Sequence, residues 1–474
     1  MDLDKILRVY FIGIGGIGMS ALAKYFHANG VTVSGYDKTS TPLTTELESE
    51  GMNIHFYDNI ELLDKNAQLV VYTPAIPKDH KEFNYYLQND YPLFKRSDIL
   101  SSITKSTFNI CVAGTHGKTT ISAMIAHILR DSGYGCNAFL GGTSVNYNTN
   151  FWSNEKKVCV VEADEYDRSF LKLCPDVAVI SAMDADHLDI YGTEELMQQA
   201  FVEFASKIKP GGLLISKLGL QKDSALTASN RLRYSLQNNR ADSYASNITI
   251  SNGTYHFDVV TTGGTLGEVV LNMGGLHNIE NAVAAISVAH YLGIKDDGIK
   301  KAVQNFKGVK RRFEYIIAPA VVPNEAGTKR SGAKPGVVFI DDYAHHPQEL
   351  EALIKGAKNL FPDFKCMVIF QPHLFTRTRD LAQQFAASLD LADEVILLQI
   401  YPARELPIEG ITSNSILDKM KMKNENKSVK TSKELIEYLE TSKNFPVEGT
   451  VLITAGAGDI DQLVEPIKKI IESK

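Results

Sequence analysis

Residues 109–120 read NICVAGTHGKTT. Residues 109–113 have the composition of a buried strand, and the glycine-rich turn after them opens a predicted helix that runs to Arg130. The end of the turn, Gly117-Lys118-Thr119, matches the end of a Walker A loop, in which backbone N–H groups and a lysine bind phosphates and a hydroxyl binds Mg²⁺. The loop is two residues shorter than the full pattern, and Val112 stands five positions before Gly117. The turn predicts a nucleotide-phosphate site, and the alternative is a chance match at a helix start.

A second glycine-rich turn, GIGGIG, occupies residues 13–18, between a predicted strand at 9–12 and a helical pattern at 19–28. Small residues let the backbone approach a diphosphate, and the free N–H groups at a helix start bind its charge. Asp37 ends the next strand, where an acidic side chain could accept a hydrogen bond from a ribose hydroxyl. This fingerprint does not distinguish NAD from another nucleotide diphosphate, and tight strand–helix packing is the alternative.

Acidic side chains follow two later strands. The strand at residues 158–161 leads into EADEYD at 162–167, and the strand at 177–181 precedes DADHLD at 184–189. Carboxylates hold Mg²⁺ beside nucleotide phosphates, so Glu162 is a candidate metal ligand. His187 is a second candidate, with a helix-capping role as its alternative. A solvated acidic turn is the alternative for the first of these segments.

Strand-like runs alternate with helical patterns along most of the chain, which predicts parallel sheets built from βαβ units. The pattern restarts at residue 109 and again at residue 337, where further strands follow at 367–370, 395–398 and 451–454. Short strands at 248–250, 255–257 and 269–271, separated by Asn252-Gly253 and Gly263-Gly264, predict a small antiparallel piece beside the second sheet. A helix from about residue 278 to 292 follows it.

We therefore expect an α/β protein with three domains, at residues 1–107, 108–313 and 314–474. The length of 474 residues agrees with this number, at about 150 residues per domain. Residues 318–336 are rich in Pro, Gly and Ala, which predicts a long surface loop or hairpin extension.

Composition limits the partners of the chain. It has 49 Lys and Arg against 56 Asp and Glu, a net charge of −7, which argues against a dedicated nucleic-acid binder. The five cysteines form no CxxC pair, so we expect no disulfide framework or zinc site and a reducing compartment. The N-terminus lacks a signal-peptide pattern, and no run of 18 apolar residues occurs. These observations predict a soluble, cytoplasmic protein with no membrane span.

Seven motifs occur in a fixed order: GIGGIGM, GTHGKTT, EADEYD, HNIENA, RRFE, DDYAHHP and QPHLFTRTRD. In this order they resemble the Mur ligases of peptidoglycan synthesis, from residue 8 to about residue 460. The resemblance implies a Rossmann-like N-terminal domain for a UDP-sugar, a central P-loop ATPase-type domain, and a C-terminal Rossmann-like domain that closes on ATP and an amino acid. It is strongest to the alanine-adding branch, which implies ligation of L-alanine to UDP-N-acetylmuramate through an acyl phosphate, with ATP and Mg²⁺. All these partners are small molecules, and a monomer or a homodimer is expected.

The resemblance also implies roles for individual residues. The UDP-sugar would face Gly15, Gly16, Ile17, Gly18 and Asp37. ATP would bind to Gly114, Thr115, His116, Gly117, Lys118, Thr119, Thr120, Asn278, Arg312 and Asp342. Metal would be held by Thr119, Glu162 and His187. The catalytic group would be Lys118, Glu162, His187 and His345, and the amino acid and sugar substrates would contact His346, His373 and Arg377.

Two positions depart from patterns in the family. Val202 stands where several sibling ligases have a carbamylated lysine, so no such lysine is expected, which is typical of the alanine-adding branch. Leu374 stands where some members have arginine, which puts one substrate contact in doubt.

Three alternatives to alanine ligation stay open. They are an NAD-dependent dehydrogenase, a nucleotide-binding regulator, and a recycling ligase of the same family that attaches a preformed peptide. The segments GIGGIGMSALA and IYPARE (residues 400–405) favour the alanine-adding member. Either His345 or His187 could take the proton from the alanine ammonium group.

Overall fold

The computed structural model describes residues 3–166, 168–185, 188–251, 253–319, 336–403, 405–442, 445 and 448–474. His187 and most of the expected loop at 318–336 lie outside these residues. The chain divides into two compact units. The first comprises Met1–Ser246, Asp258–Val269 and Glu280–Phe306, and the second comprises Asn247–Phe257, Val270–Ile279 and Lys307–Lys474.

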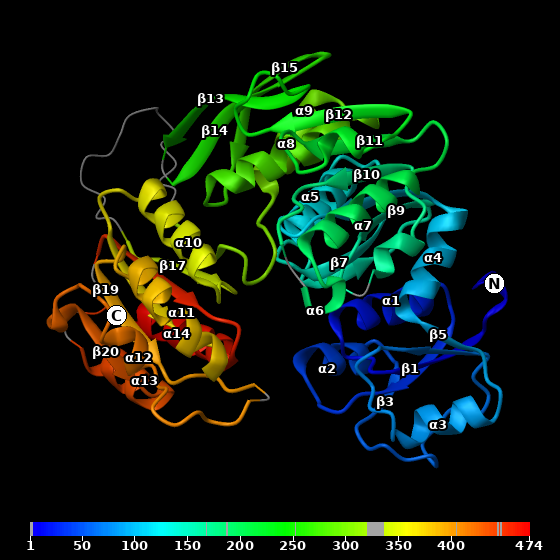
Figure 1. Cartoon of the computed structure of the whole chain (residues 1–474), viewed down its shortest axis with the longest axis horizontal. Coiled ribbons are helices and arrows are strands. Elements are labelled where there is room, and N and C mark those ends of the chain that lie inside the picture. The colour runs from blue at the N-terminus through cyan, green and yellow to red at the C-terminus, as the bar shows by residue number, and fades with distance from the viewer. Residues whose placement is uncertain are drawn as a thin grey trace. The chain divides into compact units, whose positions relative to one another are not determined.

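The first sheet has parallel strands in the order β3-β2-β1-β4-β5 (Figure 1). The strands are β1 (Arg8–Ile12), β2 (Thr32–Tyr36), β3 (Asn53–His55), β4 (Leu69–Tyr72) and β5 (Leu93–Lys95). The helices of this part are η1 (Leu3–Lys5), α1 (Ile17–Ala28), α2 (Pro42–Ser49), α3 (Lys81–Gln88) and α4 (Arg96–Ser106). Residues 9–12 of β1 are wholly buried, as in a parallel strand that is covered on both faces. The strand order reverses at β1, which is where ligand sites form in open α/β sheets.

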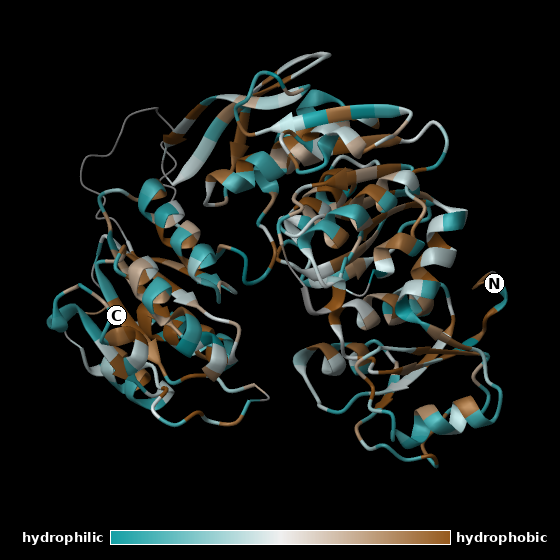
Figure 2. Ribbon diagram, in the orientation of Figure 1, coloured by the Kyte–Doolittle hydropathy of each residue, from teal (hydrophilic) through white to brown (hydrophobic). Residues whose placement is uncertain are grey.

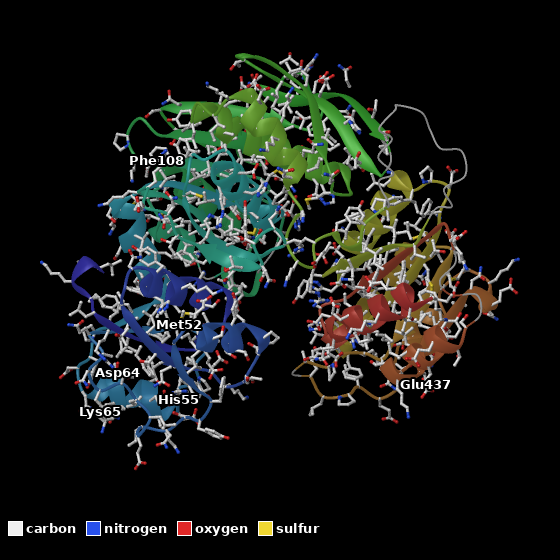
Figure 3. The ribbon with its side chains drawn as sticks, turned by 180° about the vertical axis from the view of Figure 1, so that it is seen from behind. Met52, His55, Asp64, Lys65, Phe108 and Glu437 are labelled. Atoms are coloured by element: carbon white, nitrogen blue, oxygen red, sulfur yellow. The ribbon has the colours of Figure 1, made fainter. Side chains whose placement is uncertain are left out.

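The second sheet has the order β15-β14-β13-β12-β11-β10-β6-β9-β7-β8. Its strands are β6 (Phe108–Ala113), β7 (Asn137–Ser144), β8 (Thr149–Trp152), β9 (Val158–Glu162), β10 (Val177–Ile180), β11 (Leu213–Lys217), β12 (Asn230–Ser235), β13 (Ser243–Ser251), β14 (Thr254–Thr261) and β15 (Gly264–Leu271). Phe108, labelled in Figure 3, opens β6. This strand pairs in parallel with β9 on one side and β10 on the other, so the GTHGKTT turn leaves the sheet at a second reversal of strand order.

The helices around the second sheet are α5 (Lys118–Asp131), η2 (Ser169–Lys172), α6 (Leu188–Tyr191), α7 (Glu194–Ser206), η3 (Asp223–Ala225), α8 (Leu276–Tyr291) and α9 (Asp296–Asn305). The three strands expected as a small antiparallel piece beside the second sheet, β13 to β15, continue the edge of this sheet. Only residues 262 and 263 join β14 to β15, a connection that is short enough only for an antiparallel pair.

The third sheet has the order β16-β17-β21-β18-β19-β20. Its strands are β16 (Glu314–Ile317), β17 (Val338–Asp342), β18 (Lys365–Phe370), β19 (Glu394–Leu398), β20 (Lys427–Lys430) and β21 (Thr450–Ala455). Its helices are α10 (Pro347–Leu360), α11 (Phe375–Leu389), α12 (Asn414–Leu417), η4 (Asn424–Asn426), α13 (Ser432–Thr441), η5 (Asp459–Leu463) and α14 (Val464–Ser473). Strand β16 is antiparallel to β17, and the other pairs are parallel.

The buried central strands of the three sheets, such as β1, β6, β10 and β21, are predominantly apolar and form the cores. Figure 2 shows both hydrophobic segments and more hydrophilic strands. The expected three-domain α/β architecture, with parallel sheets and a mixed central sheet, is confirmed. Across the described ranges, no helix combines the length and apolar character needed to span a membrane.

Helix α1 of the first sheet is fixed to strands β7 and β8 of the second sheet, within one unit. The Tyr25 ring lies 5.4 Å from the Phe139 ring, between centroids. Asn150 Nδ2 donates to the carbonyl of Ile17 at 2.5 Å. The buried Lys24 ammonium donates to Glu46 at 2.7 Å and to Thr149 at 3.1 Å. The start of α1 is thereby held beside the edge of the central sheet.

Candidate active site

The GTHGKTT turn connects β6 to α5 and needs glycine at two positions. Gly114 and Gly117 have φ angles of +136° and +83°, which other residues rarely adopt. A Cβ at Gly117 would lie 2.9 Å from Asn281 Oδ1, and one at Gly114 would collide with Ser181. The turn is tied to the end of β10, because the N–H of Thr115 donates to the carbonyl of Ala182 at 3.2 Å. The backbone of the predicted phosphate site is thus fixed by its surroundings.

The side chains of this turn point in different directions. His116 is exposed and lies 3.9 Å from Asp184, whereas Thr120 is buried at the start of α5. Lys118 Nζ donates to the carbonyl of Gly114 and to Glu165 Oε1, both at 2.7 Å. A lysine at this point can neutralise charge on a phosphoryl group.

Glu162 ends β9 directly beside this turn. Thr119 Oγ1 donates to Glu162 Oε1 at 3.0 Å, and the N–H of Gly141 donates to Glu162 Oε2 at 2.9 Å. Burial raises the pKa of Glu162, and the charge of Lys118 opposes this shift. A hydroxyl and a carboxylate oxygen suit Mg²⁺, which keeps several water or phosphate ligands and needs few from the protein. Within the described residues, no group of three His, Cys, Asp or Glu side chains forms a metal cage.

A cavity of about 190 Å³ extends from the start of α1, in the GIGGIG region, to Glu162 within the first unit. Its lining includes Ile17, Gly18, Arg96, Gly141, Glu162 and Asp164. A Cβ at Gly18 would lie 3.0 Å from Cζ of Arg96, so only glycine lets this guanidinium approach the start of α1. Arg96 Nη2 lies 3.7 Å from Asp164 Oδ2. The cavity therefore offers a cation and a helix N-terminus at one end and the Glu162 carboxylate at the other.

The GIGGIG turn contains the other residues expected to face a nucleotide. Gly16 is the N-cap of α1, and Ile17 and Gly18 form its first turn. The N–H of Gly15 donates to Asp37 Oδ2 at 2.7 Å. The structure thus brings Asp37 against the glycine turn, where its carboxylate already accepts one backbone N–H.

The second unit contains Asn278, Arg312 and Asp342. Asn278 Nδ2 donates to the carbonyl of Gly274 at 2.6 Å, at the start of α8. Asp342 ends β17, and its two oxygens accept the N–H groups of Phe313 and Ala344, each at 2.7 Å. Burial raises the pKa of Asp342 to about 6, against the opposing charge of Arg312. Asp342 therefore fixes the backbone turn that carries Arg312.

In the second unit, His345 and His373 follow β17 and β18, and both lie near Arg377. The rings of His345 and His373 are 6.2 Å apart, and His373 stacks on Tyr401. Burial lowers the pKa of both histidines, so each is neutral near pH 7 and able to accept a proton. His373 Nδ1 and Arg377 Nη1 are buried and find no hydrogen-bond partner among the described residues. This arrangement offers an unsatisfied guanidinium beside neutral imidazoles.

Two neighbouring positions complete this region. His346 is the N-cap of α10, and its N–H donates to Glu349 at 3.1 Å. Leu374, the N-cap of α11, has a φ of +71°, a conformation that is unfavourable for leucine. Its backbone is held there by a 3.0 Å hydrogen bond from its N–H to the carbonyl of Tyr401.

The sequence analysis missed three residues of the site. Glu165 is the ion-pair partner of Lys118, Arg96 lines the cavity, and the Gly141 N–H holds Glu162. Glu165 lies in the acidic run that drew attention to Glu162, and this run was its only sequence signal. Val202, at the position of the carbamylated lysine in sibling ligases, packs its side chain on the hydrophobic core.

Three family models match the chain in order: "Mur ligase family, catalytic domain" at residues 8–107, "Mur ligase middle domain" at 112–289, and "Mur ligase, glutamate ligase domain" at 328–458. The UDP-N-acetylmuramate–L-alanine ligase of Flavobacterium psychrophilum is 46% identical and covers 100% of both chains. That of Porphyromonas gingivalis is also 46% identical, over 98% of this chain and 99% of the relative.

The crystal structure of UDP-N-acetylmuramate–alanine ligase MurC from Thermotoga maritima superposes with a TM-score of 0.80 at 28% identity, over 98% of this chain and 99% of that one. A murein peptide ligase from Psychrobacter arcticus shares the fold, with a TM-score of 0.64 at 23% identity over 99% of each chain. The full-length identities, the three matching models and the shared architecture agree, and the chain belongs to the Mur ligase family.

Proposed function

We propose that the protein ligates L-alanine to the carboxylate of UDP-N-acetylmuramate with cleavage of ATP to ADP and phosphate, in peptidoglycan precursor synthesis. The observation that carries this proposal is the cavity that joins the GIGGIG helix to Glu162, beside the GTHGKTT turn. A sugar nucleotide that binds at the first turn can extend its carboxylate toward a triphosphate at the second. The full-length relatives at 46% identity carry the name of this activity, which supports the same substrates here.

In the first step, a carboxylate oxygen of the sugar attacks the γ-phosphorus of ATP. The new C–O–P bond forms as the bond between the γ-phosphorus and the bridging oxygen breaks, and ADP leaves with the electron pair. Lys118 opposes the charge that develops on the transferred group. Without such neutralisation, two unit charges 4 Å apart repel by about 4 kcal/mol at an effective dielectric of 20.

Thr119 and Glu162 would hold Mg²⁺, which when bound neutralises phosphate charge and orients the phosphates. His187, by its motif, is proposed as a further metal-associated residue. The Glu162 carboxylate is already oriented for metal binding, because it accepts hydrogen bonds from Thr119 and from the Gly141 backbone.

In the second step, the amine of alanine attacks the acyl phosphate, and the tetrahedral intermediate collapses with loss of phosphate. The ammonium group must first lose a proton. We assign this role to His345, whose burial keeps the ring neutral and whose Nδ1 lies 2.9 Å from the carbonyl of Tyr343. Arg377 and His373 would bind the alanine carboxylate, because both present a buried polar atom with no partner among the described residues, and His346 would also contact substrate.

In this proposal each domain binds a different substrate or part of a substrate. Residues 1–107 bind the UDP-sugar through Gly15, Gly16, Ile17, Gly18 and Asp37, and residues 108–313 bind the ATP phosphates through residues 114–120. Residues 314–474 close on ATP and alanine, with Asp342, and with Asn278 and Arg312 from the preceding segment, as nucleotide contacts. Closure would exclude water, which otherwise hydrolyses an acyl phosphate.

The reaction needs no second chain, which is compatible with a monomer or a homodimer. A cytoplasmic location is proposed because the substrates are nucleotides and four of the five cysteine side chains are buried thiols.

Phosphate release tests the proposal. The protein is incubated with ATP, Mg²⁺ and UDP-N-acetylmuramate, and with L-alanine, glycine, L-serine or a tripeptide in turn. We expect release that depends on both the sugar nucleotide and L-alanine. Faster release with the tripeptide would favour the recycling ligase, and oxidation or reduction of a nicotinamide without phosphate release would favour a dehydrogenase. Either result would refute the proposal.

A further inference from the structure

The Lys118–Glu165 ion pair is a feature that the ligation mechanism does not use. The Lys118 ammonium lies 2.7 Å from Glu165 Oε1, and the Glu165 side chain is fully buried. The lysine itself retains 15% of its side-chain exposure. The cation that must meet the ATP phosphates is therefore already partly neutralised by a carboxylate from another strand end.

Glu165 is held in place by its backbone. The hydroxyl of the buried Tyr191 donates to the carbonyl of Glu165 at 2.6 Å, and the N–H of Arg168 donates to the same carbonyl at 3.0 Å. These two hydrogen bonds fix the backbone of Glu165, and its side chain has no exposed surface. We therefore expect the carboxylate to remain beside Lys118 when a nucleotide binds.

Lys118 can donate to Glu165 and to a phosphate oxygen at the same time. An ammonium group has three N–H donors, and in this structure one points to the Gly114 carbonyl and one to Glu165. The third remains for a phosphate oxygen. Two fixed acceptors restrict the direction of this third donor, and such orientation favours a reaction whose geometry must be held closely. The nearby negative charge has the opposite effect on binding, because it repels every phosphate that approaches.

We propose that Glu165 is a positioning residue that orients Lys118 toward the transferred phosphoryl group and, by its charge, weakens the binding of ATP and ADP. This inference rests on the proposed function and adds a determinant of nucleotide affinity and product release to it. Weaker binding of ADP favours its release, which must occur in every catalytic cycle.

Glu165→Gln changes both effects, because glutamine removes the charge and offers Lys118 only the weaker hydrogen bond of a neutral acceptor. We expect the Kd of ADP, measured by calorimetry without Mg²⁺, to fall at least threefold. The kcat of alanine-dependent phosphate release should fall at least tenfold while the KM of ATP also falls. Glu165→Asp keeps the charge but shortens the side chain, so kcat should fall without tighter binding of ADP.

Glu155→Gln is the matched control, since it removes one negative charge at an exposed position of the same domain. It should leave the Kd of ADP unchanged. Weaker or unchanged ADP binding in Glu165→Gln would overturn the inference, as would an equal gain in the Glu155→Gln control. Failure of the wild-type chain to bind ADP would instead refute the proposed function, and the inference with it.

Discussion

Replacement of Gly141 by alanine tests whether the position of Glu162 limits catalysis. Gly141 lies in β7, and its φ is outside the left-handed region, so alanine can adopt the same backbone conformation. The new methyl carbon would lie 2.5 Å from both Cδ and Oε2 of Glu162. Ordinary contact begins at 3.4 Å and Oε1 is the nearest carboxylate atom, so the carboxylate must move by about 1 Å. Because Oε1 also accepts the 3.0 Å hydrogen bond from Thr119, we expect this bond to be weakened or lost.

A displacement of about 1 Å in an active site costs roughly 100-fold in rate. We therefore expect Gly141→Ala to lower kcat by about 100-fold and to raise the Mg²⁺ concentration needed for half-maximal activity. ADP binding without Mg²⁺ should be unchanged, because the substitution leaves the GTHGKTT turn intact. The assays are alanine-dependent phosphate release across a Mg²⁺ titration and calorimetry with ADP in EDTA.

Gly298→Ala is a suitable control for the same chemical change. Gly298 lies in α9, and a Cβ there meets its nearest neighbours at 3.6 and 3.7 Å. This variant should keep wild-type kcat and gain up to about 1 kcal/mol of stability, as expected for glycine to alanine in a helix. A Gly141→Ala protein with wild-type kcat and Mg²⁺ dependence would refute the reasoning.

Three further substitutions test other parts of the account. Lys118→Ala should lower alanine-dependent phosphate release at least 1000-fold, while calorimetry should still detect binding of UDP-N-acetylmuramate. Loss of that binding would mean that the two glycine turns are wrongly assigned. Asp342→Ala should raise the KM of ATP, and an unchanged KM would remove Asp342 from the nucleotide site. The same substitution should lower the free energy of unfolding in urea by about 1–3 kcal/mol, because two backbone N–H groups lose their acceptor. Burial raises the pKa of Glu82 from 4.5 to about 7, so the folded state favours the protonated carboxyl, and stability should fall as the pH rises from about 4.5 to 7. Thermal unfolding of Glu82→Gln should show a smaller decrease over this range, because Asp342, whose pKa is raised to about 6, keeps its own contribution. An identical profile in both proteins would contradict the role of Glu82.

Local sequence patterns predicted the architecture well. Apolar runs of four to six residues located β1, β6, β10 and β17 within two residues. A glycine-rich turn follows β1 and β6, whereas segments without glycine follow β10 and β17. Long-range pairing was less accessible. The three short strands after residue 241 were expected as an antiparallel piece beside the second sheet, without a predicted partner strand. They continue the central sheet because β12 offers its free edge to β13 in parallel register, a pairing that no local pattern encodes.

The candidate site was predictable only where a motif carries its chemistry in consecutive residues. The GTHGKTT turn and the acidic run at residue 162 are of this kind. Arg96 and Gly141 gave no signal, because they lie far from these motifs in sequence and join them only through packing. Asp37 was expected to accept a hydrogen bond from a ribose hydroxyl, which stays a prediction. In the structure it accepts the N–H of Gly15, a contact that no local pattern indicated.

Transfer of labelled oxygen shows whether the sugar carboxylate is phosphorylated. UDP-N-acetylmuramate with ¹⁸O in its carboxylate is incubated with the protein, ATP, Mg²⁺ and L-alanine, and the released phosphate is analysed by mass spectrometry. If the carboxylate attacks the γ-phosphorus, one ¹⁸O atom must pass into each phosphate as the amide forms. Product formation with unlabelled phosphate would show that the sugar carboxylate is never phosphorylated, and this result would contradict the account.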